Sequence, residues 1–257
     1  MTDAAQPWID ALHASHERLG ELVRGLDADA VRGPSYAKEW TIADVLSHLG
    51  SGAEIDRLRI RAAVGHTEPP GAPECQPIWD RWNAKTPQAQ AADVIPADAA
   101  DLAALDALTA TERGGAHVEM FGGSYDLAGL VALRLGEHAL HTWDVAVMLE
   151  PTAVVSADAV ALLAETTLTR TAAWWAQPTG ATFVLAVETT AGRRFTLSAT
   201  AEAVTLVSGD ADGSTSGTLR LTDEQLVRLA YGRLTDADDV HLVGASRDAV
   251  VGLFAGR

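Results

Sequence analysis

The sequence predicts an α + (α+β) protein, with a helical bundle over residues 1–152 and a small α+β part over residues 153–257. As far as about residue 150, apolar side chains recur at helical spacing. After Pro151, short runs alternate apolar and polar residues or are β-branched, as strands are, and glycines separate them. A chain of 257 residues is long enough for two modest domains.

Four helical blocks make up the predicted bundle. They cover residues 7–27, 41–65, 78–91 together with 97–108, and about 124–149. The second block opens at Thr41 as N-cap, with Asp44 as its capping-box partner. An irregular crossover is expected at residues 66–77, and Pro87 and Pro96 are expected to break the third block. No strand is predicted in this half.

The glycine-rich stretch before the fourth block contains two candidate N-caps, Ser124 and Asp126. The second half is then predicted as a helix over 156–176, strands at 182–188, 194–198, 203–207, 218–221 and 240–243, and helices at 222–231 and 248–254. Thr222 and Gln225 form a capping box at the first of these last two helices.

Charge and cysteine content limit the possible partners and location of the protein. A net charge of -16, from 19 basic and 35 acidic side chains, disfavours binding to nucleic acid or to an anionic membrane surface. No apolar run is long enough to span a bilayer. The single cysteine, Cys75, and the absence of a recognisable signal sequence predict a reducing, cytoplasmic location. Cys75 lies in a proline-rich segment and is not expected to act as a nucleophile.

A polar stripe crosses the otherwise apolar fourth block at Arg134, Glu137, His141 and Asp144. Residues at this spacing share one helix face, so Glu137 and His141 can point at the same spot. A buried charged stripe is costly unless it is paired or bound to a metal, whereas a solvated face would need no such partner. His138 competes with Glu137 as a partner for His141, and it is otherwise expected near the ligands or at the surface.

Two ligands do not make a catalytic zinc site, which typically takes about three from the protein. His48, on the flank of the second block, is either the third ligand or a histidine at the edge of the core. His13 and His16 of the first block are predicted to be surface residues.

Two motifs, residues 40–49 (WTIADVLSHL) and 137–144 (EHALHTWD), resemble the mycothiol-dependent maleylpyruvate isomerase family, a branch of the DinB-like metal-binding four-helix bundles. This resemblance implies that His48, Glu137 and His141 hold a divalent metal, usually zinc. It also implies a second domain similar to sterol carrier protein 2, and residues 157–257 are consistent with that pattern.

Other polar residues of the motifs have two possible roles each. Asp144 would either accept a hydrogen bond from His141 or form a salt bridge with an arginine of another helix. Arg134 would either pair with Glu137 or face the substrate. Arg233 would supply a cation to an acidic substrate, unless it is a surface residue.

The resemblance implies an isomerase or S-transferase in which a metal-activated thiolate of mycothiol attacks a small electrophile. The alternatives are a non-catalytic lipid- or small-molecule-binding protein with a structural metal, and a metal-dependent hydrolase, for which Asp144 is the one candidate base. A monomer or a weak homo-oligomer is expected.

Overall fold

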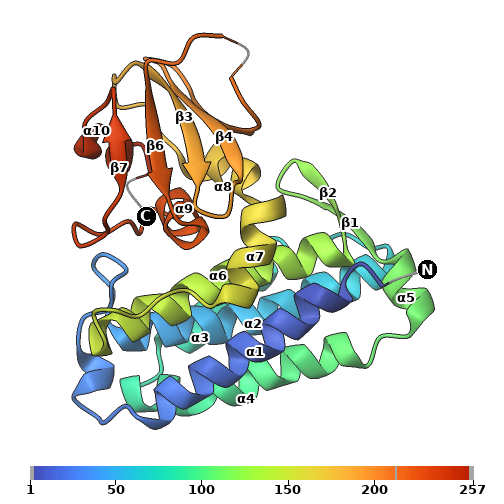
Figure 1. Ribbon diagram of the computed structural model, residues 1–257. Helices are drawn as coiled ribbons and strands as arrows, with labels where there is room; N and C mark the ends of the chain where they lie inside the picture. The colour runs from blue at the N-terminus through green and yellow to red at the C-terminus, as the bar shows by residue number, and fades with distance from the viewer. Residues whose placement is uncertain (1–2, 212, 255–257) are drawn as a thin grey trace. The chain divides into compact units, whose positions relative to one another are not determined.

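The computed structural model describes residues 3–211 and 213–254, which divide into two units on either side of the Ala159–Val160 bond (Figure 1). The first unit is helical, as predicted. Its long helices are α1 (Gln6–Arg24), α2 (Ile42–Gly65), α4 (Pro87–Asp106) and α6 (Leu127–Leu149). Shorter elements connect them, namely η1 (Ala30–Arg32), α3 (Ala72–Asn83), α5 (Ala110–Gly115), and the strands β1 (His117–Met120) and β2 (Gly123–Asp126).

Helix α2 lies at the centre of the bundle, in contact with α3, α4 and α6, while α1 packs against α4 and α6. Fully buried leucine and valine side chains, including Leu46, Leu49 and Val94, fill the space between the helices. Within the described residues, no helix has the length and apolar character needed to cross a bilayer. The packing places α2 and α6, which carry the two sequence motifs, side by side.

Local capping explains where these two helices begin. The Thr41 hydroxyl accepts a hydrogen bond from the Asp44 amide, and the Asp44 carboxylate accepts one from the Thr41 amide, which confirms the predicted capping box. Of the two candidate N-caps before α6, Asp126 is the one used, because its carboxylate accepts a hydrogen bond from the Gly129 amide at 2.8 Å.

Two predictions about prolines are wrong. The expected crossover at residues 66–77 is shorter, because α3 already begins at Ala72, with Pro73 in a first turn that needs no amide donor. Pro96 does not break the third block, since α4 runs through it. Burial of Val94 and Leu102 in the bundle offsets the hydrogen bond that the proline removes.

The prediction that the first half holds no strand is also wrong. β1 and β2 form an antiparallel hairpin in which Met120 pairs with Gly123. The two residues between them, Phe121 and Gly122, have φ values of 53° and 73°. Positive φ at both positions is typical of a type I′ turn, whose twist matches that of a two-stranded ribbon. The hairpin leads directly into Asp126, the N-cap of α6.

The second unit contains the predicted small sheet. Its strands are β3 (Phe183–Thr189), β4 (Arg194–Ala199), β5 (Val204–Ser208), β6 (Gly217–Leu221) and β7 (His241–Val243), in the order β5-β4-β3-β6-β7. β3 and β6 are parallel and the other neighbours antiparallel. The helices are α7 (Ala157–Thr166), which begins in the first unit, α8 (Leu168–Trp175), α9 (Asp223–Ala230) and α10 (Arg247–Gly252). The predicted helix over 156–176 is divided at Thr167, and the Thr222–Gln225 capping box is confirmed.

Close contact between α2 and α3 depends on a glycine. Trp82 is only 1% exposed, and its ring lies where a Cβ on Gly50 would be, so the two would overlap. We expect Gly50→Ala to lower the free energy of unfolding by about 1–3 kcal/mol, as overpacking of a core does. Urea unfolding measures the change. Gly114→Ala is the matched control, because a Cβ there meets nothing within 4 Å, and a loss in the control as large as in Gly50→Ala would contradict the explanation.

Candidate metal centre

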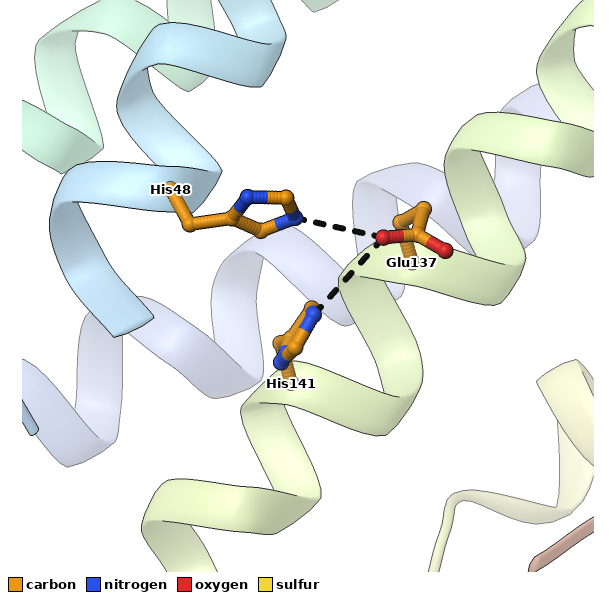
Figure 2. A group of neighbouring side chains, drawn as sticks. All are labelled: His48, Glu137 and His141. Carbon is orange, nitrogen blue, oxygen red and sulfur yellow. Dashed lines mark hydrogen bonds and ion pairs between the residues drawn. The ribbon is translucent and has the colours of Figure 1, made fainter. Parts of the chain in front are cut away.

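The three predicted ligands come together between α2 and α6. His48 Nε2 lies 3.2 Å from Glu137 Oε2, and His141 Nε2 lies 3.6 Å from the same oxygen (Figure 2). Each residue offers one ligand atom, and these atoms all lie within 4.8 Å of one another. Glu137 and His141 meet because they are one turn apart on α6, and His48 reaches them from the neighbouring helix.

These distances fit a divalent metal. In a tetrahedral site, ligands about 2.0–2.2 Å from the ion are roughly 3.3–3.5 Å from one another, which is close to the two short distances seen here. Two imidazoles and one carboxylate are also a known catalytic zinc set that leaves a coordination position open. Of the described residues, no other group of three or more histidine, cysteine or acidic side chains meets in this way.

Partial burial and charge set the protonation states of the three side chains. Burial lowers the pKa of His48 and outweighs its hydrogen bond with Glu137. Burial alone would raise the pKa of Glu137, but hydrogen bonds with His141 and His48 hold that pKa well below its usual range. A neutral His48 imidazole and an ionised Glu137 carboxylate are the forms that ligate a metal.

Asp144 orients one of the candidate ligands. Its carboxylate accepts a hydrogen bond from His141 Nδ1 at 2.8 Å and is fully buried. This is the first of the two roles considered for Asp144. With Nδ1 protonated, the lone pair of His141 is on Nε2, the atom that faces Glu137.

The Asp144 carboxylate therefore gives a testable expectation. Asp144→Asn should weaken zinc binding by about 10–100-fold, the usual cost of losing the hydrogen-bond partner of a ligating histidine. Competition with a coloured chelator measures the affinity. Asp126→Asn, which alters an exposed carboxylate on the same helix, should leave the affinity unchanged. Equal affinity in Asp144→Asn and the wild type would contradict the assigned role.

Trp40 covers both histidines and was not singled out from the sequence. Its ring centroid is 5.6 Å from that of His141, almost parallel to it, and 5.2 Å from that of His48. The loop before α2 holds it there, because the Tyr36 amide donates to the Asp144 carbonyl at 3.0 Å. The sequence signals for it were its place immediately before the N-cap of the helix that carries His48 and its inclusion in the first family motif.

The predicted pairing of Arg134 with Glu137 is wrong. Arg134 Nη2 lies 2.8 Å from Asp98 and donates to the Leu49 carbonyl, while its Nε is 3.6 Å from Asp101. The side chain is only 5% exposed. The guanidinium therefore pairs with two acids of α4 and not with Glu137, and its positive charge balances buried carboxylates inside the bundle. The predicted contact of Arg134 with substrate is not supported.

His138 and His16 belong to the same buried network. His138 is fully buried, with Nε2 3.0 Å from Asp98 and Nδ1 2.8 Å from the Ser15 hydroxyl. It is therefore neither a surface residue nor a partner of the three ligands. The surface prediction is also wrong for His16, which is partly buried with Nδ1 2.7 Å from Asp98, whereas His13 is 40% exposed.

The His16–Asp98 pair predicts a pH dependence of stability. The hydrogen bond to Asp98 raises the pKa of His16 above its ordinary value of about 6.5. The stabilisation is thus fully present below that value and is lost as the pH rises through the raised pKa. We expect His16→Gln to cost about 1 kcal/mol more at about pH 6 than at about pH 9, measured by urea unfolding. His13→Gln is the control, and an equal cost of His16→Gln at both pH values would contradict the prediction.

Two further residues lie outside the cluster. Arg233 belongs to the second unit, where it is 8% exposed and its side chain donates to the Tyr231 carbonyl. The alternative that it is a surface residue is therefore wrong, and its expected role toward an acidic substrate stays a prediction. Cys75 lies in α3 rather than in a loop and is 5% exposed, and burial raises the pKa of its thiol. A protonated, buried thiol is a poor nucleophile, as expected from the sequence.

Comparison with known proteins shows which fold and which family the chain shares. The chain matches two solved structures, that of the mycothiol-dependent maleylpyruvate isomerase and that of a histidine-to-alanine mutant of it, at 16% and 15% identity. Both matches have a TM-score of 0.69 and cover 96% of this chain and 98% of the other, which establishes a common fold. No curated protein matches the sequence. Residues 12–146, more than half of the chain and including all three candidate ligands, match the family described as the mycothiol maleylpyruvate isomerase N-terminal domain. The chain therefore belongs to the mycothiol maleylpyruvate isomerase family.

Proposed function

We propose that this protein is a metal-dependent enzyme that uses mycothiol either to isomerise a small electrophilic substrate or, as an S-transferase, to form a thioether adduct with it. The observation that carries the proposal is the meeting of His48, Glu137 and His141 in a chain that belongs to the mycothiol maleylpyruvate isomerase family. Zinc is the metal we expect, because two nitrogens and one oxygen with an open position suit it.

The residues of the chain prepare this site in three ways. His48, Glu137 and His141 would hold the ion, and Asp144 keeps the His141 lone pair directed at it. The ring of Trp40 lies against both histidine rings and would limit their motion. When bound, the metal would supply the positive charge that favours the thiolate form of a thiol near neutral pH.

The proposed chemistry then follows from the nucleophilic thiolate. In an isomerase, the sulfur forms a bond to one carbon of a conjugated double bond, and the electron pair of that bond moves onto the conjugated carbonyl. The remaining single bond rotates, and elimination breaks the carbon–sulfur bond, restores the double bond and returns the thiolate. In an S-transferase, the adduct takes up a proton and leaves.

The two alternative functions have less support. A hydrolase would need a general base, and the candidate Asp144 is fully buried and hydrogen-bonded to His141. A purely structural metal is normally held by four protein ligands, and three meet here among the described residues.

The test is an assay of the untagged protein loaded with zinc, in which maleylpyruvate is supplied with and without mycothiol. We expect isomerisation, or consumption of the thiol with formation of an adduct, only when metal and thiol are both present, and at least about 100-fold less of it in His48→Ala. If fully zinc-loaded protein with mycothiol gives neither product from maleylpyruvate nor an adduct with other conjugated acids, the proposal is wrong.

A further inference from the structure

A serine, a histidine and an aspartate from three different helices form a second group of hydrogen-bonded side chains, none of which is a candidate metal ligand. Ser15 Oγ of α1 lies 2.8 Å from His138 Nδ1 of α6, and His138 Nε2 lies 3.0 Å from the Asp98 carboxylate of α4. None of the three is more than 1% exposed. A hydroxyl within hydrogen-bond reach of a base that a third group orients is the arrangement of nucleophilic catalysis on several unrelated folds.

The surroundings of Asp98 decide which way these hydrogen bonds run. Burial alone would raise the pKa of Asp98, but its hydrogen-bond partners, with His138 first among them, hold that pKa well below its usual range. An ionised carboxylate only accepts hydrogen bonds, so His138 donates from Nε2. The lone pair on His138 Nδ1 is then left to accept the proton of the Ser15 hydroxyl.

Ser15 also lines a hollow of about 310 Å³ within the first unit. The walls of this hollow are mostly apolar and include the side chains of Leu22, Ala139, Trp143, Val154 and Val155. Arg18 and Glu21 add one charge of each sign. A volume near 300 Å³ is at the lower end for sites that bind small molecules, and the balanced charge favours a small, neutral, apolar ligand.

Two further groups of the hollow suit the negative charge that develops on a carbonyl oxygen under attack. Thr142 Oγ1 lies 3.5 Å from His138 Nδ1, the atom to which Ser15 is hydrogen-bonded. Arg18 follows Ser15 by three residues on the same face of α1, and its guanidinium pairs with the exposed Asp158 at the rim. A hydroxyl donor and a cation both stabilise an oxyanion.

We propose that Ser15 is the nucleophile of a second activity, which takes the acyl group of small, neutral, short-chain esters and needs neither metal nor thiol. Ser15 Oγ forms a bond to the ester carbonyl carbon, its proton passes to His138 Nδ1, and the π electron pair moves onto the carbonyl oxygen. When that pair returns, the bond to the alcohol oxygen breaks and the alcohol leaves with the proton. One water then releases the acid from Ser15 by the same steps. This activity is independent of the function proposed above.

The test follows acylation of the zinc-loaded full chain by p-nitrophenyl acetate, a small neutral ester. Absorbance measures the release of nitrophenol, and peptide mass spectrometry locates the acetyl group. We expect acetylation of Ser15 at a rate that chelation of the metal with EDTA leaves unchanged. Ser15→Ala and His138→Gln should each slow the release of nitrophenol by about 100-fold or more, as loss of a nucleophile or of its general base does.

Ser124→Ala is the matched control. Ser124 Oγ lies 3.3 Å from His117 Nδ1, so the same two residue types meet there, but both are exposed on the β1–β2 hairpin and neither lines the hollow. This variant should react as the wild type does.

Three outcomes would overturn the proposal. Acetyl groups found only on other residues, or a rate that Ser15→Ala leaves unchanged, would mean that the hydrogen-bonded group only holds α1, α4 and α6 together. Loss of the reaction on chelation would assign it to a metal-bound hydroxide instead. The acetyl group is located on the wild type, so this result does not depend on whether His138→Gln folds. Acetylation of Ser15 in a protein that shows no turnover with mycothiol would support this activity while contradicting the proposed function.

Discussion

Substitution of His141 by alanine is expected to leave the purified protein without metal. Among the described residues, three candidate ligand atoms meet at the site, and His141 supplies one of them. Its imidazole is held in place by Asp144. Loss of a hydrogen-bond partner of a ligating residue weakens metal binding by up to about 100-fold, so loss of the ligand itself should weaken zinc binding by more than this. Metal content by mass spectrometry and affinity by chelator competition measure the effect.

The same loss is expected for His48→Ala, and a smaller one for Glu137→Gln, which keeps the shape of the ligand and removes its charge. His117→Ala, which removes an exposed histidine of the β1–β2 hairpin, should keep its full metal content. Unchanged metal content in all three ligand variants would contradict the assignment of the site.

Arg134→Met should destabilise the helical unit by about 3–5 kcal/mol, the cost of breaking a buried ion pair by removing one partner. Asp98 and Asp101 are fully buried within reach of the guanidinium, and Asp56, which is 2% exposed, also attracts it electrostatically. Burial raises the pKa of Asp101 well above its usual range, and the charge of Asp56 raises it further. Because Asp101 can therefore take up a proton when Arg134 is removed, the loss of stability is smaller than three unpaired buried charges would cause. Urea unfolding followed by circular dichroism measures it.

Arg18→Gln is the control for this change. It breaks the ion pair with Asp158, in which both side chains are about 40% exposed, and should cost less than about 1 kcal/mol. If Arg134→Met costs no more than the control, the buried acids do not depend on this arginine.

Much of the fold follows from local sequence patterns. Helical periodicity and the capping residue Thr41 predict where α2 begins, and for α6 the sequence narrows the N-cap to Ser124 or Asp126. Alternation predicts the strands of the second unit. The errors arise where another effect decides. α4 continues past Pro96 because its packing against α2 stabilises it. The β1–β2 hairpin turns at Phe121 and Gly122, which have positive φ, and its strands are too short to show an alternating pattern in the sequence.

The site was predictable to a different degree for each residue. Glu137 and His141 are one turn apart on a single helix, so their convergence follows from spacing, and the family motif added His48. The partners of Arg134 could not be predicted in this way, because they come from α4, more than thirty residues earlier in the chain. The same holds for Trp40, whose position depends on a loop that is attached to α6 through the backbone of Asp144.

That attachment makes Asp144 a junction between the loop and the candidate metal centre. Its side chain holds His141, and its carbonyl accepts the Tyr36 amide. The rate at which the Tyr36 amide proton exchanges with solvent should therefore slow when the site is loaded, since opening the loop would then also disturb a ligand of the metal. A single backbone amide, observed by NMR, would thus report on occupancy without any added chromophore.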